Sequence, residues 1–429
     1  MGAPPGWPTW SSRCSPGAEP GGTVPRASVE RSGKVSTLLN TPAQLQLPGY
    51  GTHSLAELGP ALLAGLGVPG ERAGLGLHDL RRVVVLLVDG MGAAQLSEHA
   101  DLAPFLSSLA GTALTACFPT TTVTSMASWG TGLTPGEHGL PGYTSWVPEV
   151  DDVVSWLAWS TVGRPGPGGA PVPGRDLRAA LKPEVVQSRT TVFERAAADG
   201  IAVTQCAPVG FVGSGLTRAV LRGAEFTGAV GGGDVLSQAA RSVRRGERSL
   251  VYCYTSELDT VGHVRGPGSD AWCEQLRLVD ALARRLAEVL PPDADLLVTA
   301  DHGMVRVAEQ AKVDVDTTPG LLEGVLAVAG EPRVRHLRVR DGAGPDVVDT
   351  WRGVLAERAW VGTGDEAVAA GLFGPTVGAP ARSRIGDVLM IARDDLAVVS
   401  SVRHPREAAL VGHHGALTPA ELEVPLLRT

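Results

Sequence analysis

The sequence predicts an α/β fold in which helices cover both faces of a mostly parallel sheet, with a small α+β insertion. Short apolar runs rich in β-branched residues alternate with helical stretches, and several of these runs end directly at an acidic residue or a histidine. The spacing of the elements shortens only over residues 319–384. With 429 residues, 43% of them hydrophobic and 19% charged, the chain can bury a large core.

Charge and cysteine usage exclude several classes of protein. The formal net charge of -8 argues against a partner that is a nucleic-acid polymer, because such binding needs clustered Lys and Arg. The five cysteines form no CxxC pair, which favours a reducing compartment, and we expect a cytoplasmic location. No apolar run approaches the roughly 18 residues of a membrane span, so we expect no membrane association. Composition leaves the oligomeric state open.

The first ordered element is expected after a disordered leader at residues 1–47, which is rich in Pro, Gly and Ser and has no periodicity. Ser54 and Glu57 have the spacing of a capping box, and leucines follow at helical intervals. The apolar run 81–88 predicts a strand buried on both faces. This strand ends at Asp89.

The next elements continue the alternation of strands and helices. A helix is expected at 103–110, a strand at 112–118, and an exposed loop or flap in the Trp- and Pro/Gly-containing stretch 147–172. Further along, the predicted elements are a helix at 190–200, strands at 201–209 and 250–254, a helix at 270–290 and a strand at 295–299.

A small α+β cap is predicted at residues 319–384. Its elements are strands at 336–340 and 359–361 and helices at 346–358 and 365–372. The main domain then consists of residues 48–318 and 385–429. We find no internal repeat of 20–50 residues.

The candidate nucleophile is Thr122, the last of three consecutive threonines between a predicted strand and a predicted helix. A hydroxyl is a weak nucleophile unless a base or a metal activates it. The helix start would supply N-H groups and a positive dipole end for phosphate oxygens. Thr120, Thr121 and Thr124 are interpreted as strand and cap hydroxyls.

One candidate metal site lies in the pattern D-x-x-x-H formed by Asp259 and His263. At this spacing both side chains can face one ion. Carboxylate and imidazole together are normal Zn²⁺ ligands, and a third ligand leaves a position open for substrate. We assign His414, in the sequence GHHG near the C-terminus, as that third ligand.

A second candidate metal site lies at Asp301 and His302, which adjoin each other just beyond a predicted strand, in a turn that Gly303 permits. Asp89 and the Thr122 oxygen complete this set. Two such sites roughly 4 Å apart can hold the attacking and leaving oxygens of an in-line phosphoryl displacement.

Each motif alone has an ordinary structural interpretation. Asp89 could cap a helix, and an isolated DHG is weak evidence of a site. His413 is either a supporting partner of the metal site or an exposed residue. Trp129 and Tyr143 could stack a base or an apolar leaving group, although packing beneath the flap is slightly favoured. The prediction of a site therefore depends on the joint arrangement.

The motifs VDGMG, FPTTT through TGLTPGEHG, D-x-x-G-H and ADHGM, closed by GHHGALTPAE, follow one another between Val83 and Leu427. In this order they resemble the alkaline phosphatase superfamily, and within it the nucleotide pyrophosphatase/phosphodiesterase branch (type I phosphodiesterase-like). The resemblance implies an alkaline-phosphatase-like three-layer sandwich, two zinc ions and a covalent phosphothreonine at Thr122. It also implies the ligands of the two ions: Asp89, Thr122, Asp301 and His302 for one, and Asp259, His263 and His414 for the other.

Two positions depart from the motif of well-studied phosphodiesterases, which have a lysine before the nucleophile and an asparagine three residues after it. This chain has Thr121 and Ser125 there. The asparagine helps to hold a phosphate oxygen in those relatives. Ser125 therefore either replaces it in substrate binding or indicates a different substrate.

These observations predict a phosphodiesterase or nucleotide pyrophosphatase that uses two divalent metal ions on a small phosphate ester. No Lys or Arg occurs between Arg82 and Arg164, which favours a diester or pyrophosphate bond over the more highly charged monoester. Arg218, Arg222, Arg265 or another distant arginine could still reach the site. The alternatives are a phosphomonoesterase or phosphonate hydrolase of the same superfamily, and, in a different class, a non-catalytic binding module stabilised by metals.

Overall fold

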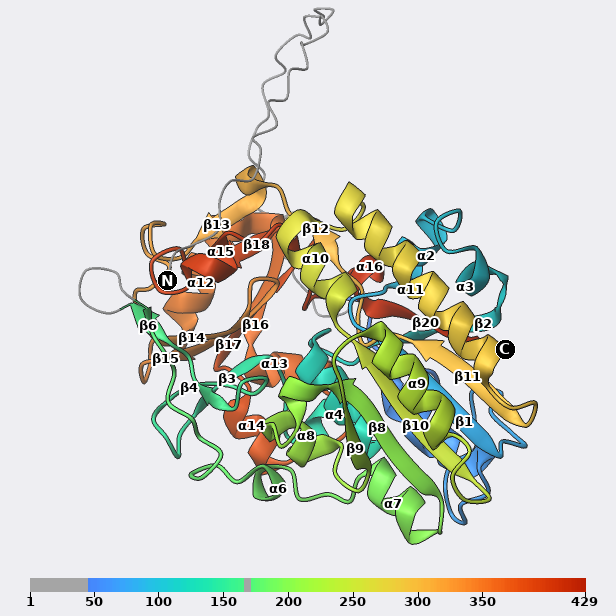
Figure 1. Ribbon diagram of the computed structural model, residues 1–429. Coiled ribbons are helices and arrows are strands. Elements are labelled where there is room, and N and C mark those ends of the chain that lie inside the picture. Colours follow the sequence, from blue (N-terminus) through green and yellow to red (C-terminus); the bar gives the residue numbers. More distant parts are fainter. Residues whose placement is uncertain (1–44, 166–170) are drawn as a thin grey trace, which may run out of the picture. The chain divides into compact units, whose positions relative to one another are not determined.

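The computed structural model describes residues 45–165 and 171–429, so nearly all of the predicted leader lies outside it. The largest sheet has seven strands in the order β2-β20-β11-β1-β10-β8-β9 (Figure 1). The bounds of these strands are β1 Arg82–Val88, β2 Ala110–Thr115, β8 Ala202–Pro208, β9 Glu225–Ala229, β10 Ser249–Thr255, β11 Ala294–Thr299 and β20 Glu423–Arg428. Within this sheet β20 alone runs opposite to the direction shared by the other strands, which confirms the mostly parallel sheet.

The strand β1 occupies the centre of the sheet because its sequence, RVVVLLV, is apolar on both faces. Val83 to Val88 are fully or almost fully buried. The strand pairs in parallel with β10 on one side and β11 on the other. The carboxyl ends of these three strands therefore meet at one edge of the sheet.

Helices form the outer layers of the sandwich. The helix α1 (Leu55–Gly65) begins with the predicted capping box of Ser54 and Glu57. Figure 1 shows α9 (Gly232–Ser242) and α11 (Asp270–Val289) lying across one face of the sheet. The other helices of this region are α2 Ala93–Glu98, α3 Pro104–Ser108, α4 Thr122–Thr131, α5 Pro135–His138, α6 Pro183–Val186, α7 Val192–Ala198, α8 Gly215–Val220 and α10 Glu257–Arg265. Among the described residues, no helix is both long enough and apolar enough to cross a bilayer.

The part of the stretch 147–172 that the structure describes is more ordered than its composition predicts, and residues 166–170 lie outside the described residues. The strands β3 (Thr144–Val147), β4 (Asp152–Ser155) and β5 (Ser160–Thr161) form a small sheet. Trp156 and Trp159 are fully buried against each other, with ring centroids 5.1 Å apart. Around the two tryptophans the prediction of an exposed loop was therefore wrong, because burial of both indoles keeps this segment packed against the protein. The strands β6 (Arg164–Pro165) and β7 (Pro171–Val172) pair beyond them.

A second sheet has four strands in the order β14-β15-β17-β16. Its elements are β14 Val325–Glu331, β15 Val334–Val339, β16 Ala359–Thr363 and β17 Val388–Ala392, with helices α12 Gly344–Leu355, α13 Gly364–Ala369 and α14 Ala379–Arg384. The predicted cap at 319–384 stops short of β17, which lies between β15 and β16. An apolar run such as VLMIA fits either sheet, so the sequence alone placed this boundary too early.

Shorter elements complete the chain around the second sheet. They are β12 Val305–Arg306, β13 Lys312–Asp314, β18 Ala397–Val399, α15 Pro405–Ala408, β19 Gly412–His413 and α16 Pro419–Leu422. A bidentate ion pair joins the β14-β15 hairpin to α16: Arg333 Nε and Nη2 lie 3.0 and 2.7 Å from the two carboxylate oxygens of Glu421. Both side chains are fully buried. Each charge therefore depends on the other for compensation.

Candidate active site

The site forms at the carboxyl ends of β1, β10 and β11. Asp89 directly follows β1, Asp259 lies in the first turn of α10 just after β10, and Asp301 and His302 follow β11. Since the three strands are parallel neighbours, their ends deliver these side chains to one place. The structure therefore brings together residues that are more than 200 positions apart in sequence.

The first cluster consists of Asp89, Asp301 and His302, which are all buried and offer ligand atoms within 4.8 Å of one another. His302 Nε2 lies 3.4 Å from Asp89 Oδ1 and 3.6 Å from Asp301 Oδ2. Thr122 Oγ1 approaches the same nitrogen at 3.3 Å. The predicted nucleophile thus adjoins the first cluster.

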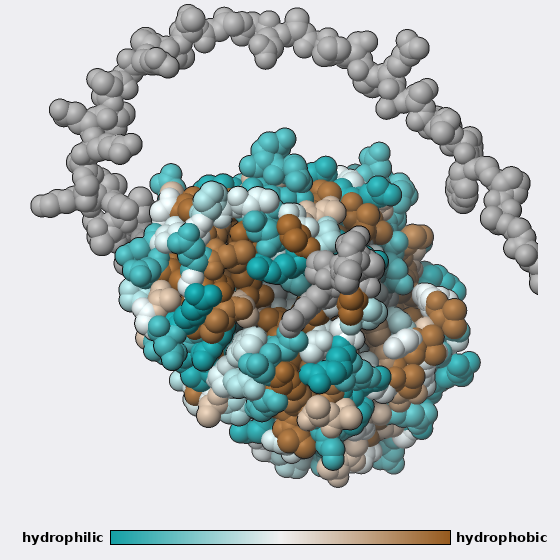
Figure 2. Space-filling view, turned by 90° about the vertical axis from the view of Figure 1, so that its left-hand side faces the viewer, coloured by the Kyte–Doolittle hydropathy of each residue, from teal (hydrophilic) through white to brown (hydrophobic). Residues whose placement is uncertain are grey.

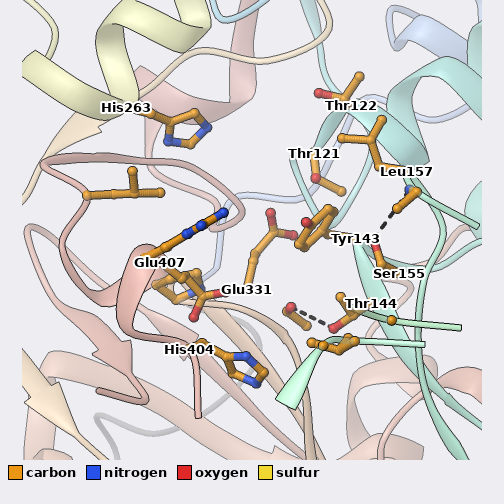
Figure 3. A pocket seen from close by; sticks show the side chains of 18 of the residues that line it. Thr121, Thr122, Tyr143, Thr144, Ser155, Leu157, His263, Glu331, His404 and Glu407 are labelled. Carbon is orange, nitrogen blue, oxygen red and sulfur yellow. Dashed lines mark hydrogen bonds between the residues drawn. The ribbon is translucent and has the colours of Figure 1, made fainter. Parts of the chain in front are cut away.

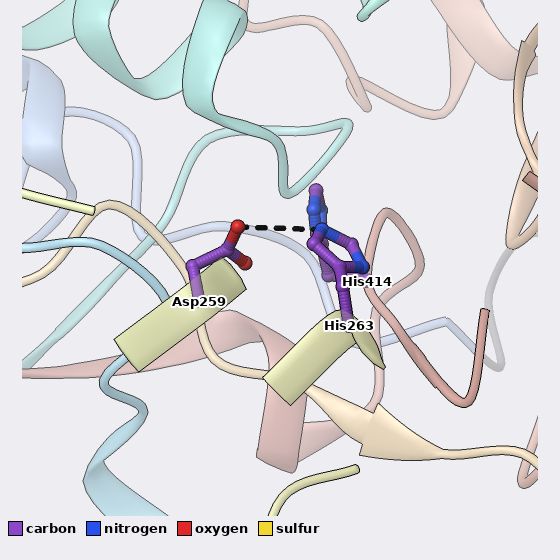
Figure 4. Close-up of side chains that lie close together, drawn as sticks. All are labelled: Asp259, His263 and His414. Atoms are coloured by element: carbon purple, nitrogen blue, oxygen red, sulfur yellow. Dashed lines mark ion pairs between the residues drawn. The ribbon is translucent and has the colours of Figure 1, made fainter. Parts of the chain in front are cut away.

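The second cluster consists of Asp259, His263 and His414, again with ligand atoms within 4.8 Å of one another (Figure 4). His263 Nε2 lies 3.3 Å from Asp259 Oδ2, and the His263 and His414 ring centroids are 5.1 Å apart. His414 also stacks on His302 of the first cluster, with centroids 3.7 Å apart and an interplanar angle of 19°. The two clusters are therefore adjacent halves of one site.

The histidines of both clusters are oriented by backbone carbonyls. The Nδ1 atoms of His263, His302 and His414 lie 2.8, 3.0 and 2.9 Å from the carbonyl oxygens of Gly412, Gly303 and Thr120, respectively. A carbonyl only accepts hydrogen bonds, so each Nδ1 is the donor and Nε2 is the nitrogen directed at the site. This is the arrangement of metal-ligating histidines.

Each carboxylate of the site has one oxygen without a hydrogen-bond donor. Among the described residues, Asp89 Oδ1, Asp259 Oδ1 and Asp301 Oδ2 are buried without a hydrogen-bond partner. Burial raises the pKa of Asp89 well above its ordinary value, and Asp301 and Asp259 raise it further. Burial likewise raises the pKa of Asp259 and lowers that of His414. Carboxylate oxygens and imidazole nitrogens that converge in this way fit a pair of divalent cations.

Two nearby residues shape the site without belonging to either cluster. Tyr254, at the end of β10, donates its hydroxyl proton to Asp89 Oδ2. Gly90 has φ +73° and donates its N-H to Asp301 Oδ1 at 3.2 Å. A Cβ on Gly90 would lie only 3.0–3.1 Å from Asp259 atoms, so a side chain there would push the two clusters apart.

The candidate nucleophile, Thr122, is the first residue of α4. Thr121 is the N-cap residue, and its side chain makes no capping hydrogen bond to the helix. The first-turn N-H groups are therefore not satisfied by the N-cap side chain, and the positive end of the helix dipole lies at Thr122. Both features suit the oxygens of a phosphate group.

A cavity of about 1120 Å³ opens beside this helix start. Its wall combines cluster residues with the small β3-β4-β5 sheet, the β14-β15 hairpin and the segment 402–410 (Figure 3). The face turned toward the viewer in Figure 2 carries apolar side chains among hydrophilic ones. The cavity is large enough for a nucleotide-sized ligand.

Three predicted substrate contacts have different outcomes. Tyr143 lines the cavity. Ser125 is fully buried and donates its hydroxyl to the carbonyl oxygen of Asp301 at 2.6 Å, and Trp129 packs in the core against Phe193 and Tyr252. Neither Ser125 nor Trp129 lines the cavity, so the structure favours the packing interpretation of Trp129 and a hydrogen-bonding role within the protein for Ser125. They face inward from a helix that is buried on almost all sides.

The arginines near the site also differ from those anticipated. Arg218 and Arg222 pair with Glu184 and Glu194 and do not line the cavity, and neither does Arg265. The arginines that do line it are Arg335, Arg403 and Arg406. Arg335 pairs with Glu407, and Arg403 pairs with Asp316 at 2.8 Å.

Sequence reasoning missed Tyr254 and Glu331, which also line the cavity. A role for Tyr254 could have been predicted, because a tyrosine at the end of a buried strand needs a hydrogen-bond partner for its hydroxyl. A role for Glu331 could not, because the strand β14 that delivers it was not predicted.

Comparison with known proteins identifies the family. The sequence profile of the family described as type I phosphodiesterase / nucleotide pyrophosphatase matches residues 83–417. No curated protein sequence matches the chain. Among solved structures, murine ectonucleotide pyrophosphatase / phosphodiesterase 5 superposes with a TM-score of 0.60 at 16% identity, covering 81% of this chain and 87% of that one.

Two further structures share the fold. An inactive threonine-to-alanine variant of the same mouse protein, in complex with AMP, gives a TM-score of 0.61 at 16% identity, again over 81% of this chain and 87% of that one. Phosphonoacetate hydrolase from Sinorhizobium meliloti 1021, in complex with phosphonoformate, superposes with a TM-score of 0.59 at 18% identity. The superposition covers 84% of this chain and 92% of that one. These likenesses show a shared architecture. The profile match covers most of the chain, which therefore belongs to the type I phosphodiesterase / nucleotide pyrophosphatase family of hydrolases, in the alkaline phosphatase superfamily.

Proposed function

We propose that this protein is a two-metal hydrolase that cleaves phosphodiester or pyrophosphate bonds of small, nucleotide-type substrates through a phosphothreonine at Thr122. The observation that carries this proposal is the pair of adjoining Asp/His clusters, joined by the His302-His414 stack, with a helix-start hydroxyl 3.3 Å from His302 Nε2. The mouse relative that a threonine-to-alanine change inactivates, and that binds AMP, supports the assignment.

The residues that would hold the two ions follow from the clusters. Asp89, Asp301, His302 and the Thr122 oxygen would hold one, and Asp259, His263 and His414 the other. The mixture of carboxylate and imidazole ligands favours Zn²⁺. When bound, the ions would stabilise negative charge on the attacking and leaving oxygens of the displacement.

The protein itself positions the reacting groups. Thr122 Oγ1 forms a bond to phosphorus while the bond from phosphorus to the leaving oxygen breaks, and water later hydrolyses the phosphothreonine. The first-turn N-H groups of α4 receive a phosphate oxygen. Tyr143 lies on the cavity wall, where its ring can contact the ester group.

The charges around the cavity favour a diester over a monoester. Arg335 and Arg403 line the cavity, but Glu407 and Asp316 already neutralise them. Among the described residues, the exposed Arg406 is the one cavity-lining arginine without an ion pair, so a monoester dianion would meet a single uncompensated arginine beyond the two ions. This supports a substrate whose phosphate group carries a single negative charge.

The proposal is tested by measuring kcat/KM for bis-p-nitrophenyl phosphate and p-nitrophenyl phosphate with the zinc-loaded protein. We expect the diester to react at least about tenfold faster, since each 1.4 kcal/mol of differential transition-state binding gives that ratio. A faster monoester would favour the phosphomonoesterase alternative. No turnover of either ester would favour a non-catalytic, metal-stabilised module.

Tyr254 provides a second test, because its hydroxyl orients the proposed ligand Asp89. We expect Tyr254→Phe to weaken zinc binding by about 10- to 100-fold, the usual result of losing a partner of a metal ligand. Competition with a chromogenic zinc chelator measures this change.

The matched control is Tyr252→Phe, two residues earlier on the same strand. The Tyr252 hydroxyl contacts only Met126 Sδ among the hydrogen-bond partners in the described chain, at 3.5 Å. This variant should keep the wild-type zinc affinity. Equal losses in both variants would mean that packing of the strand, and not the bond to Asp89, governs metal binding.

A further inference from the structure

Glu331 occupies an unusual place in the cavity. It is the last residue of β14, and Figure 3 shows its carboxyl group pointing toward Thr121, the neighbour of the nucleophile. The side chain lines the cavity although the residue is only 4% exposed. A carboxyl group thus forms part of the floor of a site that receives a phosphate ester.

Only one side of this carboxyl group has partners. The Thr121 hydroxyl is hydrogen-bonded to it, and Oε2 lies 3.5 Å from His414 Nδ1. The Nδ1 proton of His414 is already directed at the carbonyl oxygen of Thr120, at 2.9 Å. In the described part of the chain, Oε1 has no hydrogen-bond partner.

Among the described residues, no Lys or Arg forms an ion pair with Glu331. Arg335 also lines the cavity, but its guanidinium pairs with Glu407 and donates to the Val398 carbonyl oxygen at 2.8 Å. An isolated buried carboxyl group of this kind is costly unless a ligand pairs with it.

Local packing keeps Glu331 in this position. Gly415 has φ +130°, and a Cβ there would lie 2.8 Å from Glu331 Cγ. The Thr144 hydroxyl donates to the carbonyl oxygen of the preceding residue, Gly330, at 2.8 Å. The buried pair of Arg333 and Glu421 fixes the hairpin turn that follows. The carboxyl group therefore has little freedom to turn away from the cavity.

A phosphate ester alone has no reason to meet a carboxylate, because the two groups repel each other. A substrate that also carries an ammonium group next to its phosphate would satisfy both. We propose that Glu331 is a specificity-determining residue that binds a primary ammonium group on the ester substituent of the substrate. This rests on the proposed function, and it narrows the substrate class to phosphodiesters with an aminoalkyl substituent.

The test compares two synthetic diesters with the same leaving group, 2-aminoethyl p-nitrophenyl phosphate and propyl p-nitrophenyl phosphate. The two substituents have nearly the same size and differ in the ammonium group. We expect the zinc-loaded wild-type protein to have a kcat/KM at least about tenfold higher for the aminoethyl ester, the effect of one hydrogen bond to a charged group. In Glu331→Gln, the ratio of the two kcat/KM values should fall to the ratio of the rates at which the two esters hydrolyse without enzyme. Turnover of the propyl ester should persist.

Glu257→Gln is the matched control for loss of a negative charge. Glu257 is exposed and does not line the cavity, although it lies only two residues from Asp259. This variant should keep the wild-type preference for the aminoethyl ester. If it lost the preference as fully as Glu331→Gln, the discrimination would reflect long-range charge, and the proposed contact would be refuted.

Two other outcomes would also overturn the inference. One is an unchanged preference in Glu331→Gln. The other is an equal loss of turnover for both esters, which would mean that Glu331 positions Thr121 or His414 and does not recognise the substrate. Calorimetric binding of 2-aminoethyl phosphate and propyl phosphate separates this inference from the proposed function. Absence of turnover refutes the hydrolase, whereas equal binding of the two phosphates refutes ammonium recognition.

Discussion

Thr122→Ala is expected to lower kcat for a diester substrate by on the order of 10³-fold or more, because the variant lacks the only proposed nucleophile. Thr122 is the first residue of α4, and its hydroxyl lies 3.3 Å from His302 Nε2. The substitution leaves both Asp/His clusters in place. Zinc content should therefore stay close to two ions per chain, and the free energy of unfolding should change by less than about 1 kcal/mol.

Two measurements make this result specific to the nucleophile. Thr122→Ser keeps a hydroxyl at the same position and should retain much of the lost activity. Acid quenching during turnover should trap a phosphorylated peptide that contains residue 122 in the wild-type protein and none in Thr122→Ala. If the alanine variant kept turnover within about tenfold of wild type, a direct attack by water would replace the covalent route.

Removal of the metal ions should abolish activity and destabilise the fold. The unpartnered oxygens of Asp89, Asp259 and Asp301 need the positive charge that the ions supply. Ligand binding to the folded state alone stabilises a protein by about 4 kcal/mol when the free ligand exceeds its Kd 1000-fold, and we expect a loss of at least this size. Chelation followed by dialysis, urea unfolding and re-addition of Zn²⁺ measures both effects.

The destabilisation should grow as the pH rises. Burial and neighbouring carboxylates raise the pKa of Asp89, and burial raises that of Asp259, so the folded metal-free protein binds more protons than the unfolded chain does. Its stability therefore falls as the pH rises through the raised pKa values. The lowered pKa of His414 acts in the opposite sense, but its contribution is complete above the ordinary histidine pKa of about 6.5.

A series of unfolding curves from about pH 6.5 upward tests the sign of this dependence. The difference in stability between the zinc-loaded and metal-free forms should widen with pH, since bound ions replace the protons. If this difference in stability did not depend on pH, protonation of the Asp and His side chains in the two clusters would not be the cause of the pH dependence. Full activity after exhaustive chelation would contradict the two-metal site itself.

The chemistry of the site could be predicted from sequence because its ligands follow strand ends. Asp89 and the Asp301-His302 pair come directly after buried apolar runs, and parallel strands place such ends at one edge. Asp259 and His263 lie one helical turn apart on α10, so their spacing alone predicts that both side chains lie on the same face. The local sequence pattern and a general rule of sheet topology were sufficient to predict that these residues lie close together.

The wall of the cavity was much less predictable. Glu331 reaches the site from the second sheet, whose last strand in sequence, β17, lies beyond the predicted cap. Which apolar run joins which sheet depends on long-range pairing, and no local propensity encodes it. The inward-facing side of α4 was equally hidden, because a helix buried almost all round gives no periodic signal to distinguish Ser125 and Trp129 from surface residues.

The Arg333-Glu421 pair has a consequence for how relatives of this protein could diversify. The Glu421 carboxylate binds Arg333 in the hairpin turn that follows Glu331. It also accepts the backbone N-H of Ala416, two residues from His414. Mutations that shift the hairpin would therefore also disturb the reaction centre. Inherited changes in substrate range should accumulate instead at the exposed cavity-wall residues Val402, Pro405 and Arg406, where new side chains can be accommodated without loss of catalysis.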